Sequence, residues 1–302
     1  MVVYWLFRLT ILLTRPLPLW LGYRVAAAVA SVCYYGFGSQ RRAIQANVAQ
    51  ALATEDRRRI DAVARQTFRN FGKFVIDFIH FPAVTRDEVR RRLVFDQWVD
   101  LDEATHSGRG VLIVTMHFGA WDLGAAALAA YDYPINAIVD NFGYPRMNDL
   151  VHGSRDRLGM KVIPMERVGP GVFRALKRGE ILAMLIDTPP PEHAITVDFL
   201  GAPAEVSSAP ARIALRTGAW VVPSMVLRGP QGDTLIRPII DTRTVRYEPT
   251  GNEERDVRAL TTLIMRSLER HVREHPDQWY LFHPLWPQAR ERASEPALAS
   301  EL

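Results

Sequence analysis

The 302-residue chain is long enough to bury one large hydrophobic core with a smaller appended part. Its hydrophobic content of 48% is ordinary for a globular protein and excludes a mainly disordered chain. The net charge of +4 suits an anionic membrane surface or an acidic partner, and it is weaker than a dedicated nucleic-acid-binding protein would carry. The single cysteine, Cys33, excludes an intramolecular disulfide and a zinc site built from several cysteines.

The N-terminal segment 1–38 is apolar but is interrupted by Arg8, Arg15 and Arg24. Its longest charge-free run, 25–40, is shorter than the ~20 apolar residues that a membrane-spanning helix needs. The segment also carries aromatic side chains of the kind that lie at the level of lipid headgroups: Trp5, Trp20, Tyr23, Tyr34 and Tyr35. We therefore expect helices that lie in, or dip into, one leaflet of a membrane. The alternative is that these helices pack on the rest of the protein.

The next part of the chain reads as helical. Residues 40–54 are polar and helical in character, and Asp87–Leu93 reads as a short charged helix. Apolar side chains recur at helical spacing over Ile60–Ile79, which predicts an amphipathic helix whose apolar stripe faces the core. We expect residues 1–100 to form a helical, membrane-associating region.

From about residue 100, predicted strands and helices alternate. The apolar strand candidates are Val111–Thr115, Ile135–Val139, Lys161–Pro164, Ile181–Asp187, Trp220–Leu227 and Leu235–Ile240. The helix candidates are Trp121–Ala130, Pro145–Leu158, Gly171–Arg178, Ala209–Thr217 and Glu253–Glu274. This alternation predicts an α/β domain over 101–288, with a mixed, largely parallel sheet flanked by helices. The last two strands should form a hairpin-like pair, and the charged tail 289–302 should be disordered.

The segment 111–124, VLIVTMHFGAWDLG, is the most informative part of the chain. His117 follows a buried strand, and Asp122 lies five residues later in the first turn of a helix. If His117 folds back over the helix start, Asp122 could hold one ring nitrogen and leave the other as a general base. The end of a strand is where open α/β sheets place their sites. The alternative is a hydrogen-bonded loop histidine beside an acid that the helix dipole favours.

Six blocks of the sequence, in one order, resemble the bacterial lipid A lauroyl/myristoyl acyltransferase family, which includes the mycobacterial phosphatidylinositol mannoside acyltransferases. The blocks are RRAIQANVAQAL (41–52), MHFGAWDLG (116–124), RDRLGMKVIPM (155–165), FRALKRGEILAMLID (173–187), VDFLGAPAEVSSAPARIALRTGAWVVP (197–223) and HPDQWYLFHPLW (275–286). The resemblance implies a glycerolphosphate-acyltransferase-like fold and places His117 and Asp122 on the family's His-x4-Asp/Glu motif. The family commonly has Asn-Trp-Glu where this chain has Ala120-Trp121-Asp122, and the mannoside-acylating branch is closer because it favours Trp-Asp.

The resemblance implies an O-acyltransferase on the cytoplasmic face of the bacterial inner membrane. It would take an acyl group from acyl carrier protein or coenzyme A to a glycolipid or lysolipid hydroxyl. These thioesters are co-substrates, so no resident cofactor is implied. Arg155 and Arg157 match a family block and lie in a basic stretch, so we expect them to bind a substrate phosphate through their forked donors. Asp187 at a strand end and Glu205 complete the expected substrate-binding set, although a turn-capping role suits Asp187 equally well.

Two other functional classes fit the same residues. One is a thioesterase or lipid hydrolase in which His117 activates water, although the chain lacks the Gly-x-Ser-x-Gly elbow of serine hydrolases. The other is a non-catalytic membrane-binding relative, in which His117 and Asp122 could be replaced without loss of function. The spacing of His, Asp and Glu residues does not call for a metal site.

Overall fold

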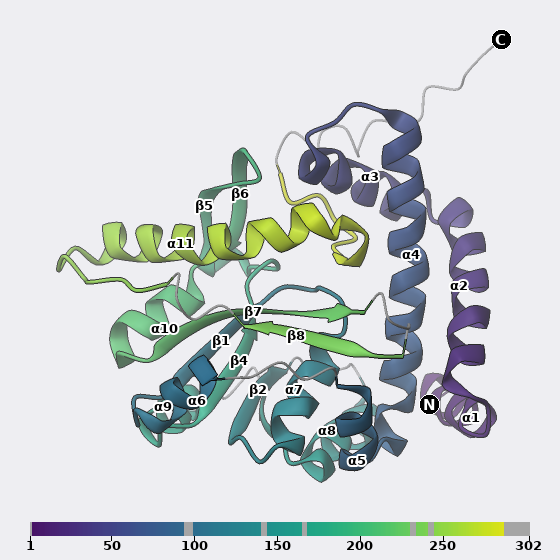
Figure 1. Ribbon diagram of the computed structural model, residues 1–302, viewed down its shortest axis with the longest axis horizontal. Coiled ribbons are helices and arrows are strands. Elements are labelled where there is room, and N and C mark those ends of the chain that lie inside the picture. The colour runs from purple at the N-terminus through teal and green to yellow at the C-terminus, as the bar shows by residue number, and fades with distance from the viewer. Residues whose placement is uncertain are drawn as a thin grey trace.

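The computed structural model describes residues 2–93, 99–139, 144–164, 168–229, 234–240 and 245–286. Its N-terminal part is helical: α1 (Val2–Thr14), α2 (Leu19–Gly36), α3 (Gly38–Leu52) and α4 (Arg57–His80). Helix α4 is the long amphipathic helix expected from the sequence, and it begins at Arg57 because Asp56 caps the backbone N–H groups of Arg58 and Arg59. In Figure 1, α4 stands between α2 on one side and the sheet on the other.

The remaining elements alternate between helices and strands. They are α5 (Arg86–Arg92), α6 (Val99–His106), β1 (Val111–Thr115), α7 (Trp121–Ala130), β2 (Ile135–Val139), α8 (Pro145–Leu158), β3 (Lys161–Pro164), α9 (Val168–Lys177), β4 (Ile181–Leu185), β5 (Ala194–Phe199), β6 (Ala202–Ser207), α10 (Ala209–Thr217), β7 (Trp220–Arg228), β8 (Ile236–Ile240) and α11 (Glu253–Glu274). Short 3-10 helices are η1 (Phe81–Ala83), η3 (Pro191–His193) and η4 (Pro276–Gln278). Most bounds agree with the expected ranges, whereas the expected tail 289–302 lies outside the described residues.

Six strands form the central sheet in the order β3-β2-β4-β1-β7-β8. All neighbours are parallel except β7 and β8, so the expected mixed, largely parallel sheet is confirmed. Successive residues of a strand point to opposite faces. On β1, Val111 and Ile113 accordingly pack with α5, α6, α7 and α8, whereas Leu112 and Val114 pack with α9, α10 and α11. Both faces are therefore covered, as a sheet with parallel strands requires.

A hairpin that the sequence analysis did not predict follows β4. Strands β5 and β6 pair antiparallel, with Phe199 opposite Ala202, so only Leu200 and Gly201 form the turn. Both turn residues have positive φ, the conformation that the favoured two-residue hairpin turn requires. Leu-Gly lacks the Asn-Gly or Asp-Gly signature by which such turns are recognised, and three prolines precede the hairpin. At its end, the backbone N–H of Ser207 donates to the carbonyl oxygen of Ile186 at 2.8 Å.

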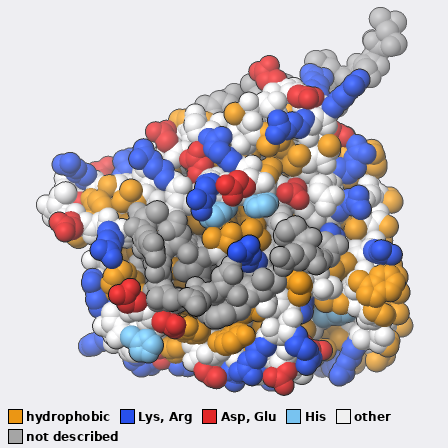
Figure 2. Space-filling view, in the orientation of Figure 1, with side chains coloured by type: hydrophobic (Ala, Val, Ile, Leu, Met, Phe, Trp, Pro, Cys, Tyr) orange, Lys and Arg blue, Asp and Glu red, His pale blue; other side chains and the backbone are white. Residues whose placement is uncertain are grey.

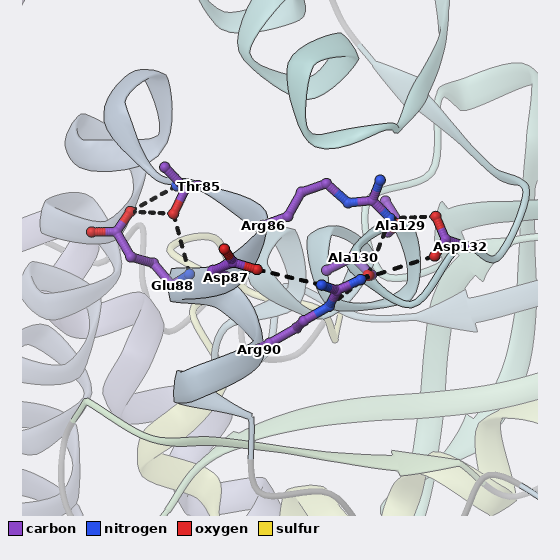
Figure 3. A network of polar contacts seen from close by, with 8 residues as sticks. All are labelled: Thr85, Arg86, Asp87, Glu88, Arg90, Ala129, Ala130 and Asp132. Atoms are coloured by element: carbon purple, nitrogen blue, oxygen red, sulfur yellow. Dashed lines mark hydrogen bonds and ion pairs between the residues drawn. The ribbon is translucent and has the colours of Figure 1, made fainter.

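Helix α5 fixes the C-terminal end of α7 (Figure 3). Arg86 Nη2 donates to the carbonyl oxygens of Ala129 and Ala130, and Arg90 also donates to the carbonyl oxygen of Ala130. The last carbonyls of a helix have no partner within it and carry partial negative charge, so guanidinium groups are well suited to them. A capping box of Thr85 and Glu88 holds the start of α5 itself. Since α7 begins at Trp121, these contacts fix the helix whose first turn belongs to the segment 116–124.

A buried charge cluster joins the N-terminal helices to the sheet. Asp77 of α4 accepts hydrogen bonds from Tyr23 of α2, Arg92 of α5 and Arg228 of β7. The side chains of Asp77 and Arg228 are only 4% and 3% exposed. Two guanidinium groups outweigh the cost of burying the carboxylate, so the pKa of Asp77 lies below its usual range.

Candidate active site

His117 lies just beyond the C-terminal end of β1, as expected. Strand β4 is the parallel neighbour of β1, and Thr115 is in register with Leu185. The residues that follow these two strands therefore emerge side by side, and this brings His117 next to Asp187 although the two are 70 residues apart in sequence. The expected strand 181–187 ends at Leu185, which leaves Asp187 outside the ladder and its carboxylate available to His117.

Asp187 binds His117 at two points. Its Oδ1 lies 2.9 Å from the ring Nδ1, and its Oδ2 accepts the backbone N–H of the same residue at 3.0 Å. The indole N–H of Trp279 also donates to Oδ2, at 3.0 Å. A carboxylate accepting at Nδ1 requires the proton on that nitrogen, so Nε2 carries the free lone pair. The His117 side chain is 26% exposed, and a substrate can therefore approach it.

The electrostatic setting favours the protonated ring. Burial by itself disfavours the imidazolium, but the charge of Asp187, its hydrogen bond and the charge of Asp122 outweigh burial and raise the pKa of His117 above its ordinary value. The cost of burying Asp187 is likewise outweighed by His117 and by the Trp279 hydrogen bond, so its pKa is lowered. Asp187 is therefore ionised, and its charge stabilises the imidazolium that forms when His117 takes up a proton.

The expected hydrogen bond between Asp122 and the His117 ring is wrong. Asp122 lies in the first turn of α7, and its Oδ1 accepts from Arg155 Nη2 of α8 at 3.0 Å. Asp187 approaches from the neighbouring strand and already occupies Nδ1, so Asp122 acts on His117 only through its charge. The sequence signal for this partner was the position of Asp187 at the end of a predicted strand.

The expected substrate-binding residues are not gathered at one place. Arg155 is buried against Asp122, whereas Arg157 is exposed and donates to the carbonyl oxygen of Pro82 in η1 at 2.6 Å. Side chains two positions apart on a helix point about 200° from each other, so the two guanidinium groups cannot bind one phosphate together. Glu205 lies on β6 opposite Thr196. Asp187 is fully buried beneath His117, where it orients the ring and is screened from a substrate.

The loop after His117 makes a close turn that requires glycine. Gly119 has φ +59°, and a Cβ there would lie 1.9 Å from the carbonyl oxygen of Val226 on β7. Without that Cβ, the loop lies against β7, and the backbone N–H of Ala120 donates to the same carbonyl at 2.9 Å. Gly124 on α7 also faces Val226, at a distance too short for a side chain. The two glycines of the motif thus let α7 and its loop pack directly on the sheet.

Aromatic rings form one wall of the site. The Trp121 ring makes an edge contact with the His117 ring, with 5.3 Å between the ring centroids, and it stacks on Phe74 of α4 with 3.9 Å between the centroids. Phe71 continues the row by contacting Phe74 and Phe282. Phe71 and Phe282 also line an apolar groove of about 400 Å³ between α2 and α4. A row of packed aromatic rings therefore links the candidate base to the groove beside the N-terminal helices.

Two kinds of comparison relate the chain to known proteins. The family model described as bacterial lipid A biosynthesis acyltransferase matches residues 1–288. The chain is similar to the phosphatidylinositol mannoside acyltransferase of Mycobacterium tuberculosis (strain ATCC 25618 / H37Rv), with 20% identity over 80% of this chain and 76% of the relative. It is also similar to the protein of that name from Mycolicibacterium smegmatis, with 20% identity over 75% of this chain and 73% of the relative. The chain belongs to the bacterial lipid A biosynthesis acyltransferase family and is an acyltransferase of lipid biosynthesis.

Proposed function

We propose that the protein transfers a fatty acyl group from a thioester of acyl carrier protein or coenzyme A to a glycolipid hydroxyl. The acceptor class that we favour is a phosphatidylinositol mannoside, because the similar mycobacterial proteins are named for acylating that lipid. The observation that carries the proposal is the His117–Asp187 pair at the ends of two parallel strands, with Nε2 of His117 free to meet a hydroxyl.

In this mechanism His117 is the general base. Its Nε2 removes the proton of the acceptor hydroxyl while the oxygen attacks the thioester carbonyl. The tetrahedral intermediate then collapses, the C–S bond breaks, and the leaving thiolate takes the proton back from the imidazolium. Asp187 holds the ring and stabilises the imidazolium, as the carboxylate of a catalytic triad does, with the substrate hydroxyl in place of a serine. The charge of Asp122 supports the same protonated state.

The apolar groove between α2 and α4 suits a hydrocarbon chain of a lipid substrate. Its lining comes from aliphatic and aromatic side chains, among them Val29, Val75 and Phe68. The row Phe71, Phe74 and Trp121 connects it to His117 through direct ring contacts. A chain lying there would keep the reacting ester near the base.

Mixed-lipid assays with mass spectrometry test the proposal. Purified protein, a labelled acyl thioester and a phosphatidylinositol mannoside acceptor should yield the labelled glycolipid ester, and omitting the acceptor should abolish the product. His117→Ala should lose the activity almost completely, since general-base catalysis contributes ~10²- to 10⁴-fold. Release of free fatty acid, with or without the acceptor, would instead identify a hydrolase. Full transfer by a folded His117→Ala protein would contradict the mechanism.

We also propose that α1 and α2 lie on the cytoplasmic surface of the inner membrane. None of the described helices has the length and apolar character needed to cross a bilayer. The two helices nevertheless expose large apolar side chains, among them Leu12, Leu13 and Val32 at 69%, 61% and 73%. Figure 2 shows hydrophobic side chains gathered at the right-hand edge, where Figure 1 places α1 and α2. Arg8, Arg15 and Arg24 on the same segment suit anionic headgroups.

Charge substitutions on these helices should release the protein from membranes. We expect Leu12→Glu, Leu13→Glu and Val32→Glu together to weaken binding to anionic vesicles at least ~tenfold, because three apolar side chains would lose their lipid contact. Vesicle co-sedimentation measures this. The matched control replaces three exposed aromatics elsewhere, Tyr131, Tyr144 and Phe173, with Glu and should bind normally. Equal binding by both triple variants would rule out this surface. Deleting residues 1–38 is a poorer test because it removes the buried Tyr23.

A further inference from the structure

We propose that the segment Gln278–Tyr280 is the positioning element of the His117–Asp187 pair, and that Trp279 is its decisive side chain. The inference deepens the proposed function, on which it rests for the role of His117. The segment lies more than 90 residues beyond Asp187 in the sequence, and each of its three residues makes one hydrogen bond to the site.

Two of these bonds come from the backbone and hold the loop on both sides of Phe118, the residue directly after the histidine. The backbone N–H of Tyr280 donates to the carbonyl oxygen of His117 at 2.8 Å, and the carbonyl oxygen of Gln278 accepts from Gly119 at 2.8 Å. The side chain of Gln278 in turn pairs with both backbone groups of Arg228 on β7, at 2.8 and 3.1 Å. The segment Gln278–Tyr280 is therefore anchored to the central sheet through Gln278, independently of the loop that it holds.

The third bond comes from the Trp279 indole and holds Asp187. Oδ2 of Asp187 accepts from this indole and from the backbone N–H of His117, which leaves Oδ1 for the ring. A carboxylate with one donor on Oδ2 can turn about its Cβ–Cγ bond, whereas two donors from different segments fix its plane. Trp279 therefore sets the direction from which Asp187 meets Nδ1.

A neighbouring tryptophan separates this role from simple packing. Trp279 and Trp286 lie in one aromatic cluster with Phe199, and both are almost fully buried, at 3% and 2%. In the part of the chain that the structure describes, Nε1 of Trp286 meets no hydrogen-bond acceptor. The two residues therefore share size, burial and surroundings, and they differ in the bond to Asp187.

The test compares Trp279→Phe with Trp286→Phe in the full-length protein. Both variants lose the same volume, but Trp279→Phe also loses the hydrogen bond to Asp187, so it should lose more thermal stability than Trp286→Phe. Only Trp279→Phe should lower kcat, by ~tenfold or more with little change in KM, because a hydrogen bond to a charged group is lost. In NMR spectra of protein with ¹³C-labelled histidine, only this variant should lower the pKa of His117, since a turned carboxylate stabilises the imidazolium less.

Each other result counts against the proposal. An unchanged His117 titration in Trp279→Phe, or equal changes in both variants, would show that Trp279 only fills the core. A rise in the pKa of His117 would show that the indole N–H weakens the negative charge of Asp187 and does not position that carboxylate. Should Trp279→Phe fail to fold, benzothienylalanine at position 279 keeps the shape and removes only the N–H. The NMR measurement needs no acyl transfer, so it decides the positioning role even if the assigned reaction is wrong.

Discussion

Replacing Asp187 with Asn is expected to lower acyl transfer at neutral pH by ~10²- to 10³-fold while the protein stays folded. Asparagine keeps the shape of the side chain but not the charge that balances the imidazolium formed as the hydroxyl is deprotonated. Its amide can also present N–H to Nδ1, which would favour the wrong ring tautomer. Initial rates of transfer from a labelled thioester measure the effect.

Two further carboxylates provide comparisons for this variant. Asp122→Asn should slow transfer less than Asp187→Asn, because Asp122 bonds to Arg155 and acts on the ring only through its charge. Asp198→Asn removes an exposed carboxylate from β5 and should leave the rate unchanged. A larger loss in Asp122→Asn than in Asp187→Asn would restore Asp122 as the main partner of the base.

Asp77→Ala is expected to destabilise the fold by about 3–5 kcal/mol near neutral pH. The substitution leaves the guanidinium groups of Arg92 and Arg228 buried together without the carboxylate between them. Since the pKa of Asp77 is lowered in the folded protein, its stabilisation is present above the unfolded-state pKa and is lost as the pH falls through the folded-state value. Denaturant unfolding of wild type and variant measures the difference.

Asp132→Asn is the control for Asp77→Ala, because asparagine removes the charge and tolerates the positive φ of +67° at this position. Asp132 also pairs with two arginines, Arg86 and Arg90 (Figure 3), but its side chain is 77% exposed. Water solvates all three charges there, so removing the carboxylate should shift the unfolding midpoint little. Similar losses in the two variants would mean that burial of the Asp77 cluster does not matter to stability.

The central elements of the fold were predictable because local patterns specify them. Strands β1, β2 and β3 and helices α7, α8, α10 and α11 have the expected bounds. Each strand is a short apolar run, and Gly218 ends α10 with φ +68°, the conformation that favours glycine. The β5–β6 hairpin was not predicted, because its turn, Leu200–Gly201, lacks the common sequence signature of hairpin turns and three prolines precede it.

The site was predictable only in part, because the order of strands in the sheet decides which residues lie next to His117. His117 could be placed from its strand, but the spacing to Asp122 suggested a local pairing. The actual ring partner, Asp187, depends on β4 being the neighbour of β1, which no local pattern specifies. Trp279 comes from a distant segment that crosses the loop after β1, and the sequence carries no signal for that contact.

The pH dependence of kcat/KM for acyl transfer, in wild type and in Asp187→Asn, tests most directly whether His117 held by Asp187 is the base. The base must be neutral to act, so the rate should rise with pH through the pKa of His117. In the wild type this rise should be centred above the ordinary histidine value of 6.5, because the charge of Asp187 raises that pKa. In Asp187→Asn, burial is no longer outweighed by this partner, and the rise should move to lower pH while the plateau falls. A wild-type rise centred at or below 6.5, or one that keeps its position in Asp187→Asn, would contradict the assignment.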